Sequence, residues 1–349
     1  MVKKVLLGMS GGVDSSVAAL LLKEQGYEVY GATLWLCANK DNGLPDTAKG
    51  AKEVCLKLGI EHQVFDFRDQ FSKQVIQRFA AAYAAGQTPN PCIDCNRYIK
   101  FKLLYQKARE LGYYHIATGH YAKIEFAANR GRWLLKKAAD KAKDQSYVLY
   151  ALPQEILSAA LFPLGSLTKA QARQIAAEHS LPGAHKPESQ DICFVPDGDY
   201  AAFLARLPGS AAPPGDFLDT QGRVLGRHRG LPHYTIGQRK GIHISFGAPR
   251  YVTAIDAASN TVTLGEEADI FSDSLLACDM NLIALEKLTE PLQVSVKCRY
   301  KQPETEAIIS PMPDDRVQVR FAHPQRALTP GQAVVFYDGD TVIGGGTIL

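Results

Sequence analysis

The sequence predicts an α/β protein, with a doubly wound parallel sheet in its first half, then a small central module and a C-terminal β-barrel. Short apolar runs alternate with helical patterns over residues 5–118, as expected for a parallel sheet with helices on both faces. After Pro196 the pattern changes to short alternating runs, which are typical of antiparallel strands. We therefore expect three units, at residues 1–200, 201–272 and 273–349.

The elements of the first half follow in order. A strand at residues 5–9 leads directly into a helix with apolar residues at helical spacing, and Gly26 is placed to end it. Further strands are expected at residues 29–36, 62–67 and 115–118, and helices at residues 48–58, 69–84 and 96–111. The helices are long enough to cover both faces of the sheet.

The second half is expected to consist mainly of β-structure. The Pro/Gly-rich stretch at residues 208–215 marks a loop or linker. Residues 251–255 and 261–264 are separated by turn-forming residues and predict a hairpin, whereas residues 292–298, 307–310, 316–321 and 333–337 predict strands of a small barrel or sandwich.

Composition excludes several classes of protein. The chain has 349 residues, which is long for one core, and 46% of them are hydrophobic. No stretch of about eighteen apolar residues is present, and no signal-peptide pattern precedes the first strand. An odd number of cysteines, seven, then predicts reduced thiols in the cytoplasm with metal or catalytic uses. The net charge of +3 neither requires nor excludes nucleic acid.

A phosphate-binding loop follows the first strand. Its sequence is Ser-Gly-Gly-Val-Asp-Ser, at residues 10–15. Two adjacent glycines allow backbone amides to approach an oxyanion, the serines add hydroxyl donors, and the following helix directs its positive end to the same anion. The loop lacks the Lys-Ser/Thr pair of a Walker loop and the glycine spacing of a dinucleotide fold. We therefore expect ATP to bind here.

Three cysteines are candidates for chemistry. Cys92 and Cys95 lie between a Pro-rich loop predicted at residues 88–91 and the helix predicted from Asn96, where a helix N-terminus would lower the pKa of the Cys95 thiol. Cys193 lies on a segment flanked by Pro and Gly, which predicts a loop able to reach the site. A zinc ribbon would need a second CxxC, although zinc completed by His stays open. The remaining four cysteines are interpreted as small hydrophobic residues in or near cores, namely Cys37, Cys55, Cys278 and Cys298.

At this point the chain resembles a known family. The segments that carry the resemblance are residues 10–15, 88–96, 118–121, 143–147, 189–194, 234–239, 298–300 and 329–332. They occur in the order seen in tRNA-specific 2-thiouridylases, which are ATP pyrophosphatases of the PP-loop type with an adenine nucleotide α-hydrolase-like sheet. The resemblance spans nearly the whole chain.

The resemblance implies a defined reaction. ATP, with Mg²⁺, adenylates the C2 carbonyl of the wobble uridine (position 34) of tRNAs for Lys, Glu and Gln and releases pyrophosphate. Sulfur from a cysteine persulfide then displaces AMP and gives 2-thiouridine, either by direct attack of a Cys193 persulfide on the activated carbon or as hydrosulfide released when Cys95 forms a disulfide with Cys193. A cysteine desulfurase or a sulfur-relay protein would supply the sulfur, no membrane is involved, and a monomer bound to one tRNA is expected.

The family pattern also assigns residues. Cys95 matches the nucleophile and Cys193 the persulfide carrier, while Asp14 would orient the loop or bind Mg²⁺. The expected ATP-binding residues are Gly8, Met9, Ser10, Gly11, Gly12, Val13, Asp14, Ser15, Leu34 and Gly119. The expected tRNA-binding residues are Asn90, Pro91, Cys92, His120, Lys143, Asp144, Gln145, Arg299, Tyr300 and Gln332.

One departure from the family pattern leaves the mechanism open. Many members have Asp where this chain has Cys92, so that Cys92, Cys95 and Cys193 could ligate a [4Fe-4S] cluster that carries sulfide. Two different functions would also be compatible with the loop at residues 10–15: an ATP-pyrophosphatase ligase acting on a small substrate, and a metal or iron-sulfur RNA-binding protein in which the loop is inactive. Neither function needs the loop, the thiols and the β-modules together.

Basic residues suggest where RNA binds. Lys136, Lys137 and Lys141 precede the segment 143–147, although such a run is also compatible with a solvated surface. In the central module, Tyr234 is interspersed among further basic side chains, namely Arg227, His228, Arg229, His233, Arg239 and Lys240. We expect this combination to contact tRNA.

Overall fold

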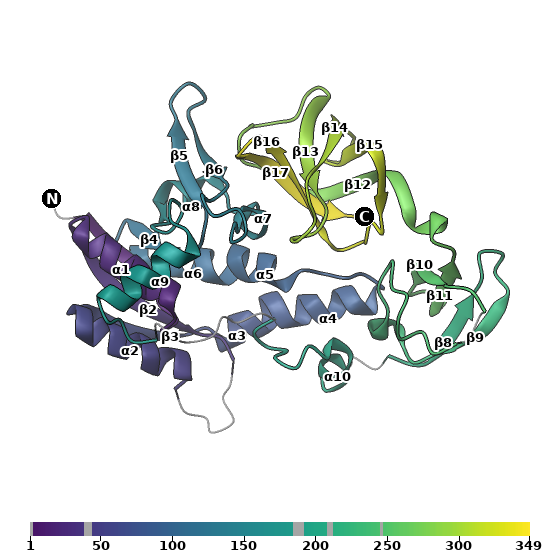
Figure 1. Cartoon of the computed structure of the whole chain (residues 1–349), viewed down its shortest axis with the longest axis horizontal. Helices are drawn as coiled ribbons and strands as arrows, with labels where there is room; N and C mark the ends of the chain where they lie inside the picture. The colour runs from purple at the N-terminus through teal and green to yellow at the C-terminus, as the bar shows by residue number, and fades with distance from the viewer. Residues whose placement is uncertain (1–2, 38–43, 184–191, 208–211, 245–246) are drawn as a thin grey trace.

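A computed structural model describes residues 3–37, 44–183, 192–207, 212–244 and 247–349 of the protein. It contains a helix-covered parallel sheet, a small β-module and a β-barrel, and the barrel sits above two long helical segments (Figure 1). Residues 208–211 of the predicted linker and residues 189–191 of the Cys193 segment lie outside the described residues. The predicted fold class is confirmed.

The parallel sheet positions the nucleotide loop. Its five strands are β1 (Lys3–Gly8), β2 (Tyr27–Trp35), β3 (Glu61–Asp66), β4 (His115–Ala117) and β7 (Ala160–Leu161), in the order β3-β2-β1-β4-β7. Strand β1 is central and fully buried over residues 5–7. Because the chain leaves β1 for β2 on one side and β4 lies on the other, a crevice is expected at the carboxyl end of β1.

Helices pack on this sheet and extend from it. Those near the sheet are α1 (Val13–Glu24), α2 (Asp46–Leu58), α7 (Ser146–Leu149), α8 (Gln154–Ala159) and α9 (Lys169–Glu178). Two long helical segments each contain a π-helical stretch: α3 (Arg68–Phe71), η1 (Ser72–Ile76) and α4 (Gln77–Ala84) form one, and α5 (Pro91–Asp94), η2 (Cys95–Phe101) and α6 (Lys102–Glu110) form the other. The short helix α10 (Tyr200–Ala205) precedes the middle module.

The helix predicted from Asn96 begins five residues earlier, at Pro91. Asn90 is its N-cap, since the Asn90 side chain accepts a hydrogen bond from the Cys92 amide at 3.1 Å. Pro91 occupies the first helical position, where its missing N–H costs nothing. The helix therefore starts at Pro91, and only the last residue of the loop predicted at residues 88–91 is helical.

The middle module is a four-stranded sheet. Its strands are β8 (Gly215–Leu218), β9 (Val224–His228), β10 (Tyr251–Asp256) and β11 (Thr261–Gly265), in the order β10-β11-β8-β9, with short 3-10 turns at Leu231–His233 and Ala268–Ile270. The predicted hairpin is confirmed as the antiparallel pair β10–β11. Phe217, Tyr234 and Val252 are among the residues of its separate small core.

The C-terminal barrel has six strands. They are β12 (Phe271–Leu282), β13 (Leu292–Lys297), β14 (Thr305–Pro311), β15 (Val317–Arg326), β16 (Ala333–Asp338) and β17 (Thr341–Ile348). Strand β12 closes the barrel because its first half pairs with β15 and its second half pairs with β17. A hairpin that we did not predict from the sequence, β5 (Lys123–Ala127) and β6 (Arg132–Lys136), adjoins β17 through the pair Thr341–Lys136.

Buried polar contacts fix the barrel to the sheet domain. The Tyr147 hydroxyl donates to the Ala333 carbonyl at 2.8 Å, and the Tyr150 hydroxyl donates to the Gly346 carbonyl at 3.2 Å. The Asn281 amide donates to the carbonyls of Tyr150 at 2.6 Å and of Leu152 at 3.0 Å. A Cβ at Gly345 would lie 2.7 Å from the Tyr150 ring, so the glycine allows the strand to approach this closely. The two units therefore share one buried, hydrogen-bonded boundary.

None of the helices in the described part of the chain has both the length and the apolar character needed to cross a bilayer.

Replacing Asn281 with Ala should destabilise this boundary. The variant leaves two part-buried carbonyls without their donor, so we expect the free energy of unfolding to fall by about 1–3 kcal/mol. Urea unfolding followed by intrinsic fluorescence measures the change. Asn129→Ala, at an exposed turn between β5 and β6, serves as the control and should leave the midpoint unchanged. An unchanged midpoint for the Asn281 variant would contradict the role of this boundary.

Candidate functional site

The predicted phosphate loop lies between β1 and α1 as expected. The Ser10 amide donates to the Ser15 hydroxyl at 3.2 Å, and the Ser16 hydroxyl donates to the Gly12 carbonyl at 2.8 Å. Gly11 has a φ of +68°, and a Cβ there would lie 2.6 Å from the Ala51 nitrogen, so only glycine fits. The loop is a tight turn at the N-terminus of a 12-residue helix, a geometry suited to an oxyanion.

The Asp14 carboxylate in the first turn of α1 is bound on two sides. Lys169 Nζ lies 2.7 and 2.8 Å from its two oxygens, and the Tyr121 hydroxyl donates to it at 2.8 Å. Of the two roles expected for Asp14, this arrangement favours orienting the loop. A contact with Mg²⁺ stays a prediction.

Gly119 borders the loop, and Leu34 lies on β2, the neighbour of β1. Leu34 lies near the carboxyl end of β2, and Gly119 lies shortly after β4. A Cβ at Gly119 would lie 2.8 Å from the Asp14 carbonyl carbon and 2.9 Å from the Ser15 nitrogen. The backbone at Gly119 therefore lies directly against the first turn of α1. The predicted contacts of Leu34 and Gly119 with the nucleotide stay predictions.

The environment of Cys95 differs from the expected one. Because the helix begins at Pro91, Cys95 lies in its second turn and is only 6% exposed. Burial raises the pKa of the Cys95 thiol to about 12, while the Lys100 ammonium acts in the opposite direction. The expectation that a helix N-terminus lowers the pKa of this thiol was wrong. Cys92, one residue into the helix, is exposed to solvent.

Cys193 belongs to the same thiol group. Its neighbour Phe194 packs edge-on against Phe71 at 5.7 Å and Phe79 at 5.4 Å between ring centroids, which anchors the segment on the first long helical segment. Cys193 is exposed, and although burial of its sulfur raises the pKa of the thiol, Lys100 lowers it. Cys193 and Cys92 each contribute to the raised pKa of Cys95. The structure therefore brings the three predicted thiols together.

Two further residues of this thiol group were missed from the sequence. Burial raises the pKa of the Cys92, Cys95 and Cys193 thiols, and the Lys100 ammonium opposes this rise at all three. Lys100 lies five residues after Cys95 in the π-helical stretch. Cys37, just beyond β2, has a pKa raised to about 11 by burial and by Cys193. Cys37 packs against the core of the sheet domain, as predicted, and it also lies beside the thiol group.

All seven cysteines are free thiols. Cys55 and Cys298 are buried in cores as predicted, and Cys278 is half-buried on β12. Within the described residues, no three His, Cys, Asp or Glu side chains are arranged to hold a metal ion. The cysteines of an iron-sulfur cluster bind different irons and lie further apart than the ligands of one ion, so a cluster on Cys92, Cys95 and Cys193 stays a prediction.

The predicted tRNA-binding residues meet where the barrel contacts the sheet domain. Tyr300 donates its hydroxyl to the Asp144 carbonyl at 3.0 Å, and Gln332 donates to the Thr88 carbonyl at 2.8 Å. The Arg299 guanidinium instead donates to the Ala327 carbonyl and to the Thr329 hydroxyl, both at 2.9 Å, so it also supports the barrel. Contacts of these residues with RNA stay predictions.

His120 is buried next to the loop. Its Nδ1 lies 2.7 Å from the Thr118 hydroxyl, and burial lowers its pKa to about 3, with Lys100 adding to the shift. The ring is neutral near pH 7 and is covered by protein, which leaves no charge for a phosphate. A contact between His120 and tRNA stays a prediction.

Several basic residues predicted to meet RNA have protein partners. Lys136, Lys137 and Lys141 form ion pairs with Glu125, Glu304 and Asp340, at 2.6, 2.5 and 2.5 Å. In the middle module, His228 and Tyr234 are buried, and Arg227 pairs with Asp216 at 3.2 Å. Arg229, Arg239 and Lys240 are exposed. These three are the better candidates for phosphate contacts.

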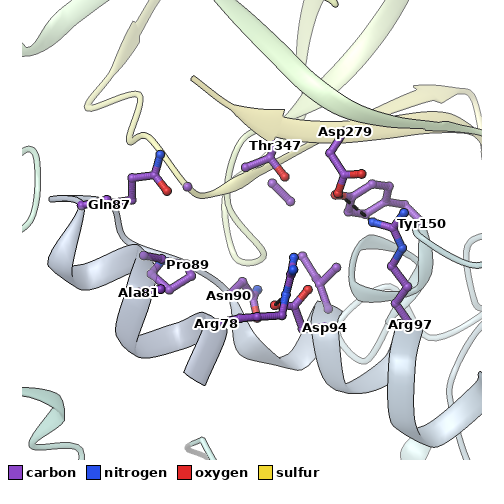
Figure 2. Close-up of a pocket in the computed structure, with 15 residues that line it drawn as sticks. Arg78, Ala81, Gln87, Pro89, Asn90, Asp94, Arg97, Tyr150, Asp279 and Thr347 are labelled. Carbon is purple, nitrogen blue, oxygen red and sulfur yellow. Dashed lines mark hydrogen bonds and ion pairs between the residues drawn. The ribbon is translucent and has the colours of Figure 1, made fainter. Parts of the chain in front are cut away.

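A separate cavity of about 360 Å³ lies between the long helical segments and the barrel (Figure 2). Arg78 pairs with Asp94 at 3.1 Å, and Arg97 pairs with Asp279 at 2.7 Å, so opposite charges are matched along its wall. Asn90 lines it, but none of the described cysteines does. The thiol group therefore lies outside this cavity.

A parallel sheet whose central strand leads into this loop defines an α/β nucleotide-binding protein of the PP-loop class. Family models match along the chain, with descriptions of a tRNA methyl transferase HUP domain at residues 3–197, a tRNA methyl transferase PRC-barrel domain at 201–266 and an aminomethyltransferase β-barrel domain at 272–348.

Relatives that match over the full length carry more specific names than the family models do. A tRNA-specific 2-thiouridylase MnmA of Acetivibrio thermocellus is 50% identical, covering 99% of both chains. One of Heliobacterium modesticaldum is 51% identical, covering all of this chain and 93% of the relative. One of Caldanaerobacter subterraneus subsp. tengcongensis is 50% identical, covering 99% of this chain and 97% of the relative. The chain belongs to the tRNA-specific 2-thiouridylase family.

The thiols should differ in their reactivity toward iodoacetamide. At pH 8 we expect Cys92 and Cys193 to be alkylated at least about tenfold faster than Cys95, because Cys95 is buried and protonated. The rate at Cys95 should still rise with pH above 10, since its raised pKa of about 12 keeps the thiol neutral below that range. Peptide mass analysis measures each site.

Cys55 and Cys298 are the buried controls, and denatured protein should be alkylated evenly. Alkylation of Cys95 ahead of Cys92 and Cys193, or a plateau in its rate below pH 9, would contradict this assignment.

Proposed function

We propose that the protein is an ATP-dependent tRNA-uridine 2-sulfurtransferase that converts the wobble uridine (position 34) of tRNAs for Lys, Glu and Gln to 2-thiouridine. The two chemical requirements are a site that activates the uridine C2 carbonyl with ATP and a site that delivers sulfur. Membership of the tRNA-specific 2-thiouridylase family supports both. ATP would bind at residues 8–15 with Mg²⁺, and the thiols would deliver the sulfur.

The observation that carries this proposal is the shared border of the phosphate loop and the thiol helix. Gly119 lies against Asp14 and Ser15, and the neighbouring His120 ring lies 5.5 Å from Phe101 between ring centroids. Phe101 ends the π-helical stretch that begins with Cys95. An adenylated base held near residues 119–120 would therefore be adjacent to both the phosphate loop and the helix that carries Cys92 and Cys95.

The proposed sulfur transfer uses two thiols. The C2 oxygen of uridine attacks the α-phosphate of ATP and releases pyrophosphate. The terminal sulfur of a Cys193 persulfide then attacks C2 and releases AMP. Finally, the Cys95 thiolate attacks the Cys193 sulfur, which leaves 2-thiouridine on the tRNA and a Cys95–Cys193 disulfide on the protein. A thiol reductant restores both cysteines.

A cluster route would give the same product. It would use Cys92, Cys95 and Cys193 as ligands, each bound to a different iron. We propose the persulfide route, because the exposed Cys193 is accessible to a protein that donates persulfide sulfur. A ligase acting on a small substrate is not favoured, because the relatives that match over full length are named tRNA-specific 2-thiouridylases.

The sulfur would come from a cysteine desulfurase or a sulfur-relay protein, which fits the exposure of Cys193. We propose that the enzyme acts as a monomer in the cytoplasm, which agrees with its seven free thiols.

The central test is formation of 2-thiouridine from unmodified tRNA. The protein is incubated with a tRNA transcript, Mg²⁺-ATP and a cysteine desulfurase charged with cysteine, and nucleosides are analysed by mass. We expect Cys95→Ser and Cys193→Ser to lose activity by at least about a hundredfold, since each removes a required thiolate. Cys278→Ser, outside the thiol group, is the matched control and should keep its activity.

Full activity of either site variant would overturn the assignment of the two thiols. The same assay separates the two routes when iron and acid-labile sulfide are measured on the same preparation. Full activity in protein without iron supports the persulfide route. Activity that follows iron content from zero to full occupancy overturns it.

Binding of tRNA should depend on the exposed cations of the middle module. We expect Arg239→Ala and Lys240→Ala each to weaken tRNA binding several-fold and to lower the salt slope by about one, because each removes one phosphate contact. ATP affinity should change little. Filter binding at several salt concentrations measures the slope. Arg223→Ala, an exposed arginine paired with Asp219, is the control, and an unchanged dissociation constant for both test variants would contradict the assignment.

A further inference from the structure

The Asp14 carboxylate sits beside a loop suited to phosphates, where an unpaired negative charge would repel the ligand. Lys169 contacts both of its oxygens, at 2.7 and 2.8 Å, and is itself only 12% exposed. Two N–H groups of the ammonium are thereby directed at Asp14. The ion pair neutralises the carboxylate and leaves the positive end of α1 as the dominant field at the loop.

Lys169 is held in place by its own helix. It is the first residue of α9, whose N-cap Thr168 forms a reciprocal capping box with Gln171. The Lys169 amide donates to Asp140 at 2.9 Å. Helix α9 contributes Ala176 to the small core that also contains Val13 and Val17 of α1. The backbone that carries the ammonium is therefore rigid relative to the first turn of α1.

Tyr121 reaches Asp14 from the other side. Its hydroxyl donates to Asp14 at 2.8 Å, and its ring is 3% exposed in the core shared with Val13. Both polar groups of its backbone bind Gln145: the Tyr121 amide donates to the Gln145 side chain at 2.9 Å, and the Gln145 amide donates to the Tyr121 carbonyl at 2.8 Å. Tyr121 therefore links Asp14 to the segment 143–146.

We infer that Lys169 and Tyr121 are positioning residues of the phosphate loop. They act through Asp14, and they set the orientation of the first turn of α1 before ATP arrives. Since Tyr121 is held by Gln145, the loop and the segment expected to contact tRNA form one connected unit. This inference rests on the proposed use of ATP at residues 8–15, but it assigns roles to two residues that this use alone does not require.

The test measures binding of α,β-methylene-ATP with Mg²⁺ to the full-length protein by calorimetry, without tRNA. We expect Tyr121→Phe to raise the dissociation constant about three- to tenfold, less than the full effect of one hydrogen bond to a charged group, because the loss reaches ATP only through Asp14. Lys169→Met should raise it further, and Lys169→Arg should recover most of the affinity because it keeps the ion pair. Tyr251→Phe and Lys107→Met are the matched controls, a buried tyrosine and a surface lysine away from the loop.

A second comparison separates positioning from direct contact with ATP. If Lys169 acts through Asp14, the double variant Asp14→Asn, Lys169→Met should lose no more affinity than Asp14→Asn alone. Additive losses would mean that Lys169 contacts the nucleotide itself and would overturn the inference. Wild-type affinity in both Tyr121→Phe and Lys169→Met would overturn it as well.

The inference and the proposed function fail in different ways. Wild-type protein that binds the ATP analogue but forms no 2-thiouridine would contradict the proposed reaction while leaving the positioning roles measurable. Normal thiolation by wild type, together with unchanged nucleotide affinity in the variants, would contradict only the positioning roles. Thermal unfolding midpoints of Tyr121→Phe and Lys169→Arg within about 2 °C of wild type would show that lost affinity is not lost folding.

Discussion

The buried boundary between barrel and sheet domain is the constraint on which the rest of the site depends. Tyr147, Tyr150 and Asn281 satisfy backbone groups across it, and a buried carbonyl without its donor is costly. The segment 143–150 is thereby fixed from the barrel side. Because Gln145 in this segment binds Tyr121, and Tyr121 holds Asp14, the shape of the phosphate loop depends on contacts made far away in the sequence.

Local patterns predicted the fold well where a single segment determines its own structure. The strand, loop and helix around residues 10–15, and the hairpin β10–β11, follow from apolar periodicity and turn residues. The helix start at Pro91 was missed, although Asn90 is a favourable N-cap residue and Pro91 is a favourable first residue of a helix. Their Pro-rich neighbourhood suggested a loop. The hairpin β5–β6 pairs its own two strands over five residue pairs around a short turn, so its local pattern was overlooked rather than absent.

The sequence predicted which residues form the thiol site, but not their burial or their protonation. The motif placed Cys92, Cys95 and Cys193 together, and the structure agrees. Lys100 and Cys37 join them from a helix interior and from the end of β2, positions that carry no motif. Burial also decides the protonation of a thiol, and burial depends on packing from several elements. The sequence therefore suggested a reactive Cys95, whereas its surroundings keep the thiol protonated.

The solvent exposure of Cys193 and Cys95 predicts the order of the proposed sulfur-transfer steps. A protein that donates sulfur must bring its own persulfide into contact with the accepting thiol, and an exposed cysteine allows this whereas a buried one does not. Cys193 is exposed and Cys95 is 6% exposed, so sulfur from a partner protein would arrive at Cys193 first. The burial that keeps Cys95 protonated slows both an early attack on the persulfide and the final disulfide step, so the proposed route requires the Cys95 thiolate to form once the sulfur is bonded to C2.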